Sequence, residues 1–277
     1  MKQLSYKSYK TPLRYPGGKS RAVKTLKLDL PAQFTEFREP FVGGGSVAIH
    51  VTKEYPNVDV WVNDKYYNLY NFWTQLRDRG EELHGTISSI KRPLVGNAEK
   101  HRELFTTAKE QIDEHDDFSR AVFFYILNKC SFSGLGESSS FSKMASQSNF
   151  SLRGINKLPY YSSLIQNWKI TNLDYGELMN APSQGKCFVF LDPPYDIKDN
   201  LYGPQGKLHS GFDHARFYEE VKKCNHSAMI TYNSNPVLRG RFHQFAQKEW
   251  DLTYTMRSVG NYNKDQSKRK ELLITNY

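Results

Sequence analysis

Four consecutive residues, Asp192-Pro193-Pro194-Tyr195, place a carboxylate, two rigid carbonyl groups and an aromatic ring at one point of the chain. They follow the apolar run 187–191, which predicts a buried strand that ends where proline forbids ladder pairing. Open α/β sheets bind their ligands at the carboxyl ends of such strands. Because proline has no N–H, nearby carbonyl oxygens stay free to accept hydrogen bonds. Acceptors beside a ring suit a planar group with an exocyclic NH2; a plain proline turn is the alternative.

A glycine-rich turn over residues 43–48 (GGGSVA) fits the pattern G-x-G-x-x-[G/A], and Asp64 follows it about twenty residues later. In nucleotide-binding folds such a turn lets the backbone approach a ligand, and the acidic residue binds ribose hydroxyls. The spacing leaves a dinucleotide and S-adenosylmethionine both open. A second turn at 14–20 (RYPGGKS) is not a P-loop, because Leu13 stands where that motif needs a glycine.

The elements around these motifs predict a doubly wound sheet. Alternation over residues 58–62 indicates a strand, and a helix is expected over about 65–80. Further strands are expected at 168–171, 187–191 and 228–232, and a hairpin from 252–256 and 271–275.

The middle of the chain has a different character. Residues 118–129 carry the apolar face of a helix, whereas the Ser-, Gly- and Asn-rich stretch 131–156 predicts exposed loops suited to recognition. We therefore expect an α/β fold in which residues 1–80 and 166–277 form a Rossmann-like sheet domain. Residues 81–165 would form an inserted, mostly helical domain.

The composition favours a polyanionic partner. The 277 residues carry a net charge of +9, with a pI near 9.2, and 14% of them are aromatic. Basic residues among aromatic ones suit phosphate contact combined with base stacking. The mean hydropathy of −0.68 and the lack of an apolar run of ~20 residues predict no membrane segment. Since the start also lacks the apolar core of a signal peptide, a cytoplasmic location is expected.

The cysteines and histidines indicate neither disulfides nor a metal site. Cys130, Cys187 and Cys224 are far apart and form no CxxC pair, which predicts reduced, unpaired thiols. The eight histidines have no ligand spacing, so we expect no metal.

Several motifs occur in one order along nearly the whole chain: 15–19 (YPGGK), 39–46 (EPFVGGGS), 63–64 (ND) and 192–195 (DPPY). With 120–128 and the tail 268–273, they resemble the Dam-like family of site-specific DNA adenine-N6 methyltransferases (D12 class, alpha-group motif order). The resemblance implies S-adenosylmethionine as cofactor, double-stranded DNA as partner and the insert as target recognition domain. DPPY alone is shared by methyltransferases of adenine and cytosine, in DNA or RNA, so the ordered set is the more specific signal.

The resemblance also implies which residues bind the cofactor. Asp64 would take the ribose hydroxyls, and Asn172, Asp174 and Tyr175 fall where the family contacts the cofactor's adenine; a strand-end turn is the alternative for residues 174–176. The implied cofactor residues are Tyr15, Gly18, Lys19, Phe41, Gly43, Gly45, Ser46, Asp64, Asp174, Tyr175 and Asp192.

The expected catalytic residues are Asp192, Pro193 and Tyr195. The exocyclic amine of adenine is a poor nucleophile, because its lone pair is delocalised into the ring. The Asp192 carboxylate and the Pro193 carbonyl could accept its two N–H bonds and stabilise positive charge that develops on the nitrogen. Tyr195 would stack on a base flipped out of the helix.

The expected DNA contacts include a residue that differs from the family pattern. In GATC-recognising members an arginine that reads guanine falls at Glu137, and a carboxylate cannot make that donor contact. Glu137 would accept from cytosine N4 or face solvent. Phe132 lies where a ring can wedge into the gap left by a flipped base, with core packing as the alternative. The expected DNA-binding residues are Lys129, Phe132, Ser133, Glu137, Arg153, Lys268 and Arg269, with Lys157 and Lys264 as further phosphate contacts.

The resemblance therefore implies methyl transfer from S-adenosylmethionine directly to the exocyclic amine of a flipped adenine in a specific duplex site. The alternatives are a cytosine-N4 or RNA amino-methyltransferase, or a catalytically silent DNA-binding module. The implied setting is the cytoplasm of a bacterial cell. The chain would act there as a monomer, either as the partner of a restriction endonuclease or as a solitary or phage-encoded enzyme.

Overall fold

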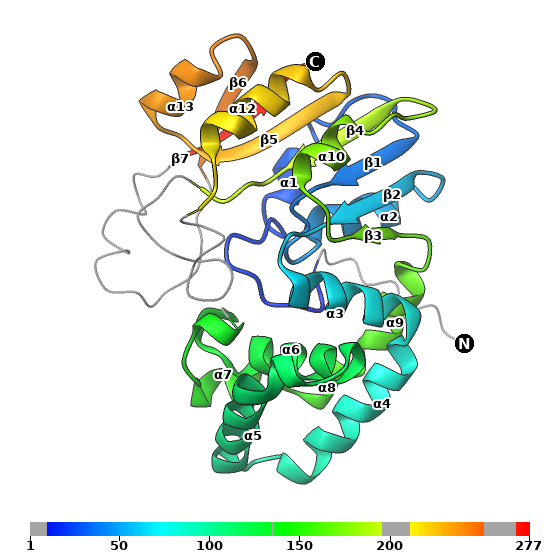
Figure 1. Ribbon diagram of the computed structural model, residues 1–277, viewed down its shortest axis with the longest axis vertical. Helices are drawn as coiled ribbons and strands as arrows, with labels where there is room; N and C mark the ends of the chain where they lie inside the picture. Colours follow the sequence, from blue (N-terminus) through cyan, green and yellow to red (C-terminus); the bar gives the residue numbers. More distant parts are fainter. Residues whose placement is uncertain (1–9, 135, 196–210, 252–269) are drawn as a thin grey trace.

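The computed structural model describes residues 10–134, 136–195, 211–251 and 270–277. One seven-stranded sheet lies at its centre, in the order β3-β2-β1-β4-β5-β7-β6 (Figure 1). The strands are β1 (Glu36–Glu39), β2 (Asp59–Asn63), β3 (Lys169–Thr171), β4 (Cys187–Leu191), β5 (Ser227–Asn233), β6 (Ala246–Asp251) and β7 (Lys270–Thr275). The first five run parallel, and β7 is antiparallel to both β5 and β6. The expected Rossmann-like α/β fold is confirmed.

The direction of strand addition reverses between β1 and β4. From β1 the chain proceeds through β2 to β3, whereas β4 lies on the other side of β1 and leads to β5. Because β1 and β4 are parallel neighbours, with Arg38 opposite Val189, their carboxyl ends reach the same edge. Open α/β sheets bind ligands in the crevice at such a reversal. The glycine turn after β1 and the Asp192 motif after β4 therefore meet.

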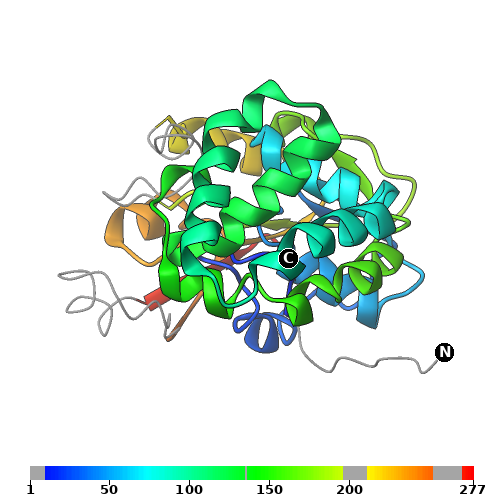
Figure 2. The same cartoon turned by 90° about the horizontal axis from the view of Figure 1, so that it is seen from below.

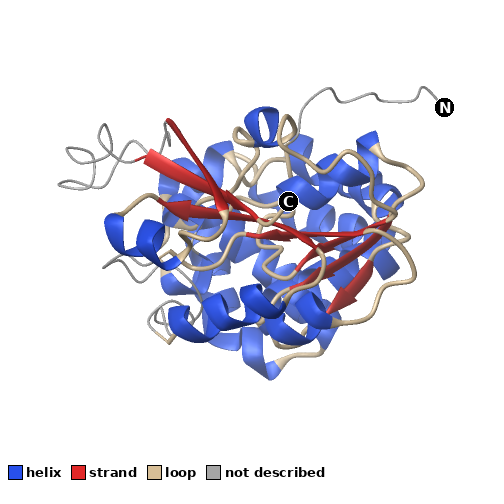
Figure 3. Ribbon diagram, turned by 90° about the horizontal axis from the view of Figure 1, so that it is seen from above, coloured by secondary structure: helices blue, strands red, loops and turns tan. Residues whose placement is uncertain are grey.

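Helices cover both faces of the sheet, as the view from above shows (Figure 3). All five residues of β4 are buried, which fits a central parallel strand. Its alternate side chains enter two different core clusters, Phe188 and Phe190 on one face and Val189 and Leu191 on the other. The helices associated with the sheet are α1 (Val23–Leu26), α2 (Ser46–Glu54), α3 (Tyr67–Asp78), α10 (Tyr175–Asn180), α12 (His214–Lys223) and α13 (Pro236–Arg241).

Between α3 and β3 the chain is helical, and this segment lies below the sheet in Figure 1 and in front of it in Figure 2. The Phe72 ring of α3 stacks on the Tyr125 ring of α6, with centroids 6.0 Å apart and planes at 17°. The helical segment and one sheet face thus share a continuous core. The segment contains α4 (Gly80–Lys91), η1 (Arg92–Leu94), α5 (Ala98–Gln111), η2 (Ile112–Glu114), α6 (Asp117–Cys130), η3 (Phe132–Gly134), η4 (Gly136–Ser138), α7 (Lys143–Ser148), α8 (Leu152–Ile155) and α9 (Leu158–Leu164).

The stretch 131–156 differs from the exposed loops that its composition predicts. It contains α7 and α8, and the side chains of Phe150 and Ile155 are fully buried. Each of the two helices begins after a serine, Ser142 or Ser151, whose hydroxyl accepts a hydrogen bond from a backbone N–H of the first turn. Such caps stabilise short helices in a segment whose average composition is polar.

The C-terminal hairpin also differs in part from the prediction. Strand β7 agrees with the prediction, and it pairs antiparallel with the strand before it. That strand is β6, which was not predicted, whereas residues 252–256 lie outside the described residues. β6 has the polar sequence AQKEWD, which an edge strand tolerates because only one of its sides pairs within the sheet.

The described residues show three further features. The three cysteines are buried and free, as predicted. Across the described ranges, no group of three or more His, Cys, Asp or Glu side chains could hold a metal ion. No helix in those ranges is long and apolar enough to cross a membrane.

Candidate active site

A cavity of about 270 Å³ opens at the carboxyl edge of the sheet, among the residues that follow β1, β2 and β4. Most of the predicted cofactor residues line it: Tyr15, Gly18, Lys19, Phe41, Gly43, Ser46, Asp64, Asp174, Tyr175 and Asp192. The described lining includes neither Gly45, Pro193 nor Tyr195. The prediction missed other lining residues, among them Glu39, Tyr66, Phe212 and Arg216.

The glycine turn after β1 packs tightly against two aromatic rings. Gly43 has φ +48° and Gly45 has φ +69°, a left-handed backbone that favours glycine. A Cβ atom at Gly43 would lie 2.9 Å from the Tyr15 ring, and one at Gly45 would lie 2.8 Å from the Trp73 ring. The Gly43 N–H donates to the Asp64 carboxylate at 3.0 Å. The turn and Asp64 thus form one unit, in which Gly45 makes room for the Trp73 ring.

Burial raises the pKa of two carboxyl groups in the cavity. Burial raises the pKa of Asp64 to about 6, although the backbone N–H groups of Tyr66 and Gly43 donate to it. Glu39 is 3% exposed and accepts from the Ala48 N–H at 2.9 Å, and burial raises its pKa well above the usual range. A ligand that brings hydroxyl or ammonium donors would offset this desolvation.

The Asp192 carboxylate is held from two sides. The Nζ of Lys19, which is 3% exposed, lies 2.7 Å from Oδ1 and 2.8 Å from Oδ2, and it also donates to the Gly17 carbonyl at 3.0 Å. The Thr231 hydroxyl, on the neighbouring strand β5, donates to Oδ1 at 2.8 Å. A carboxylate has about four lone-pair sites, so Asp192 can accept further N–H groups through its exposed part. Its orientation is fixed before any substrate arrives.

Tyr195 is half-buried, and its contacts include Glu271, Lys19 and Tyr232. Its hydroxyl donates to Oε2 of Glu271 on β7 at 2.6 Å. The Lys19 ammonium lies 5.0 Å from the centroid of its ring, and the Tyr232 ring lies 5.8 Å away. Sequence reasoning gave no role to Thr231 or Glu271, because their contacts arise only from the pairing of β4, β5 and β7.

Aromatic side chains form one wall of the cavity. The ring centroids of Phe41, Tyr175 and Phe212 are 5.3–5.8 Å apart, a group that offers apolar surface to a planar ligand. The Arg216 guanidinium lies 4.9 Å from the Tyr175 ring and pairs with both oxygens of Asp174 at 2.5 and 3.1 Å. Asp174 also caps α10, so residues 174–176, for which a strand-end turn was the alternative, are the start of a helix.

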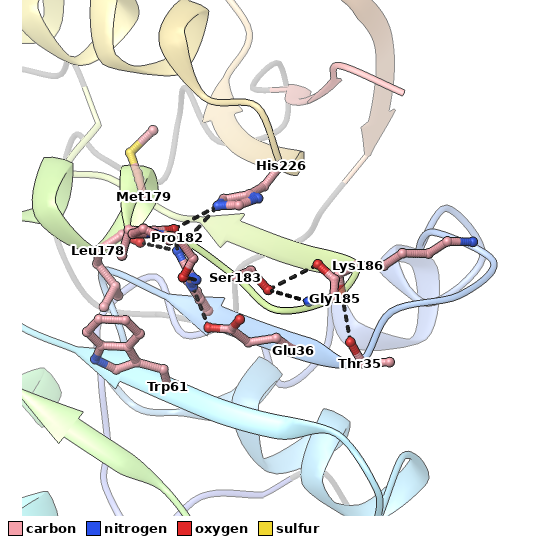
Figure 4. A network of polar contacts seen from close by, with 12 residues as sticks. Thr35, Glu36, Trp61, Leu178, Met179, Pro182, Ser183, Gly185, Lys186 and His226 are labelled. Atoms are coloured by element: carbon pink, nitrogen blue, oxygen red, sulfur yellow. Dashed lines mark hydrogen bonds and ion pairs between the residues drawn. The ribbon is translucent and has the colours of Figure 1, made fainter.

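The far end of α10 is anchored by a buried arginine. Arg38, fully buried on β1, donates to the carbonyl groups of Leu178, Ala181 and Pro182 at 2.6–2.9 Å and to the Glu36 carboxylate at 2.7 Å (Figure 4). These carbonyls end α10 and have no helical partners of their own. The network thereby fixes the helix that begins with Tyr175, in the cavity wall.

One residue predicted to contact DNA, Lys129, is buried. Lys129 is 7% exposed in the last turn of α6, where its Nζ lies 5.2 Å from the centroid of the Tyr125 ring. Burial, and secondarily the charge of Arg14, lowers the pKa of Lys129 to about 7. In this arrangement the ammonium packs against the protein interior and does not face solvent. The sequence contained a signal for this burial, because Lys129 follows Tyr125 by one helical turn on the apolar face.

Glu137 is partly buried, and one of its carboxylate oxygens already accepts two hydrogen bonds. Its Oε1 accepts from the Tyr66 hydroxyl at 2.5 Å and from the Asn68 amide at 2.8 Å, and burial raises its pKa. These bonds tie the loop that carries Glu137 to the segment that follows Asp64.

The other predicted DNA contacts lie in several settings. Phe132 is 37% exposed, which excludes the core-packing alternative for its ring. Ser133 is half-buried, with φ +54°, and Arg153 is exposed on α8. Lys268 and Arg269, like Lys264, lie outside the described residues.

Known proteins match this chain over most of its length. It is 24% identical to the type II methyltransferase M.MjaIII of Methanocaldococcus jannaschii, over 96% of this chain and 98% of that protein. It is 22% identical to the type II methyltransferase M1.LlaDCHI of Lactococcus lactis subsp. cremoris, over 95% and 94%. A DNA adenine methylase of Salmonella typhimurium shares 27% identity over 66% and 64%. The family model for the D12 class N6 adenine-specific DNA methyltransferases matches residues 15–256, which confirms the resemblance. The chain belongs to this family of DNA adenine methyltransferases.

Proposed function

We propose that this DNA adenine methyltransferase takes its methyl group from S-adenosylmethionine, bound in the cavity at the ends of β1, β2 and β4. The main support is that the reversal between β1 and β4 brings the glycine turn, Asp64 and Asp192 to a single cavity. The group fits the residues present. Asp64 would accept from its ribose hydroxyls, the aromatic wall of Phe41 and Tyr175 would contact its adenine, and the turn at 41–46 would lie beside its methionine part.

In the proposed mechanism the protein acts by positioning and electrostatics. Bound S-adenosylmethionine supplies an electrophilic methyl group on a sulfonium. The Asp192 carboxylate and the Pro193 carbonyl accept the two N–H bonds of the adenine amine, which directs the nitrogen lone pair towards the methyl carbon. The same acceptors stabilise the positive charge that develops on the nitrogen as its bond to the methyl carbon forms and the bond from that carbon to sulfur breaks. The methylated amine then loses one of its N–H protons to water, and Tyr195 stacks on the flipped base. Lys19 and Thr231 hold Asp192 in place.

The target is a specific site in double-stranded DNA, recognised by residues 81–165 as an inserted domain beside the catalytic parts 1–80 and 166–277. Phe132 would fill the gap left by the flipped base, and its exposed ring supports this role. Ser133 and Arg153, with Lys268 and Arg269, would contact the DNA. The chain would act as a monomer in the bacterial cytoplasm, with a restriction endonuclease as its functional partner or alone, including as a phage-encoded enzyme.

Nucleoside mass spectrometry on unmethylated bacterial DNA, incubated with the purified protein and S-adenosylmethionine, tests the proposed donor and product. N6-methyladenine that carries the label of methyl-labelled S-adenosylmethionine supports the proposal. N4-methylcytosine would overturn the proposed base contacts. If no methylated base forms on DNA, whether or not RNA is methylated, the proposed reaction is overturned.

A further inference from the structure

A buried carboxylate on β7 connects the Tyr195 hydroxyl to the sheet. The hydroxyl donates to Oε2 of Glu271 at 2.6 Å, and Glu271 is 5% exposed. Glu271 lies on β7, opposite Asn233 of β5 and Trp250 of β6. Because β7 is hydrogen-bonded on both sides, the backbone that carries this carboxylate is rigid, unlike a loop.

The two key side chains after β4 are therefore held by two different strands. Thr231 of β5 holds Asp192, and Glu271 of β7 holds Tyr195, while the Lys19 ammonium lies against both of them. A hydrogen bond to a buried carboxylate is short and strong, and it restrains the tyrosine ring at its far end. The remaining torsional freedom of that ring is thereby restricted in the protein without substrate.

We propose that Glu271 is a positioning residue for methyl transfer: it fixes the ring of Tyr195 at the angle needed to stack on the target base. This inference rests on the proposed function, in which Tyr195 stacks on the flipped adenine. Glu271 itself touches no reacting atom. Its effect is on the chemical step, because a base that is stacked loosely presents its amine poorly to Asp192.

The test compares variants by the single-turnover rate of methyl transfer from S-adenosylmethionine to unmethylated DNA. Glu271→Ala and Tyr195→Phe each remove the hydrogen bond, and each should lower this rate by about tenfold to hundredfold. The KM for S-adenosylmethionine should stay within about twofold of the wild-type value, since the bond lies outside the cofactor residues. Because both variants remove the same bond, the double variant should be no slower than the slower of the two single variants.

Two further variants separate positioning from general damage to the sheet. Glu271→Gln keeps an acceptor oxygen and should retain the rate within about threefold. Glu249→Ala removes a carboxylate from neighbouring β6, where it contacts Ser234, Arg239 and Lys270 but not Tyr195, and it should leave the rate unchanged. A purely structural role would instead lower the melting temperature of Glu271→Ala without a selective loss of rate.

The outcomes distinguish this inference from the proposed function. Tyr195→Ala should be at least as slow as Tyr195→Phe, and wild-type activity in Tyr195→Ala would overturn the stacking role itself. If Tyr195→Ala is slow but Tyr195→Phe and Glu271→Ala transfer at the wild-type rate, the role of Glu271 is refuted while the role of the ring survives. Should Glu271→Ala not fold, Tyr195→Phe alone decides, because it deletes only the hydroxyl.

Discussion

Replacing Thr231 by valine isolates one hydrogen bond to the proposed catalytic carboxylate. The Thr231 side chain is fully buried and donates to Oδ1 of Asp192 at 2.8 Å. Valine has nearly the same shape but lacks the hydroxyl. A hydrogen bond to a charged group contributes about 1.5–3 kcal/mol. Since Lys19 still holds Asp192 after the change, we expect a loss near the lower limit, about 1.5–2 kcal/mol of folding free energy.

The same loss predicts both a thermal and a kinetic effect. For a chain of this size, each kcal/mol lowers Tm by about 2–4 °C, so Thr231→Val should melt about 3–8 °C lower. A carboxylate that can rotate away from the amine should slow methyl transfer by about tenfold, which corresponds to about 1.4 kcal/mol of activation free energy.

Thr231→Ser is the matched control, because it keeps the hydroxyl and removes one buried methyl group at a cost of about 1 kcal/mol. Scanning calorimetry gives Tm, and single-turnover transfer of labelled methyl to unmethylated DNA gives the rate. The serine variant should lose some stability but keep nearly the wild-type rate. Equal rates for the valine variant and the wild type, or equally slow valine and serine variants, would refute the argument that this hydroxyl orients Asp192.

Three other substitutions give separate tests. Burial raises the folded pKa of Asp64 to about 6 from 3.8, so this group contributes stability below about pH 4 that is lost as the pH rises through 6. Because ribose hydroxyls donate to the ionised form, calorimetric affinity for S-adenosylmethionine should fall as the pH drops below about 6, and Asp64→Asn should bind weakly without this pH dependence. Burial lowers the folded pKa of Lys129 to about 7, so below pH 7 the buried ammonium destabilises the folded state. This destabilisation decreases as the pH rises and disappears above the ordinary lysine pKa near 10. Lys129→Met should therefore raise the free energy of unfolding, measured in urea at pH 7, and this gain should shrink as the pH approaches 10. The substitution should leave DNA affinity unchanged; weaker DNA binding would support the phosphate-contact hypothesis. Glu137→Ala should lower the free energy of unfolding by about 1–3 kcal/mol, because the Tyr66 hydroxyl and the Asn68 amide lose their acceptor; an unchanged urea midpoint would contradict this structural role.

The parts of the site that follow strands could be predicted from the sequence. The apolar run that became β4 ended at Asp192, and the alternating run that became β2 ended at Asn63, next to Asp64. The spacing of apolar residues and the residue types of turns are local signals, so they were sufficient to predict where these strands end. The adjacency of β1 and β4 is an arrangement common in doubly wound sheets.

The residues that support the site could not be predicted in this way. Thr231 meets Asp192 only because β5 pairs with β4 in one register, with Ile230 opposite Leu191. Glu271 depends on β7 lying antiparallel between β5 and β6, which the polar sequence of β6 does not indicate. Long-range register decides both contacts, and a single sequence contains no local signal for it. Lys129 is different. Its helical position beside Tyr125 could have predicted its burial despite its charge.

The central claim is that the Asp192 carboxylate drives methyl transfer without being needed to bind DNA. Measuring Asp192→Ala by single-turnover transfer and by DNA affinity in the same buffer tests this claim most directly. The account predicts that transfer of labelled methyl to adenine N6 is abolished while most of the DNA affinity remains. Methyl transfer by Asp192→Ala at the wild-type rate would contradict it.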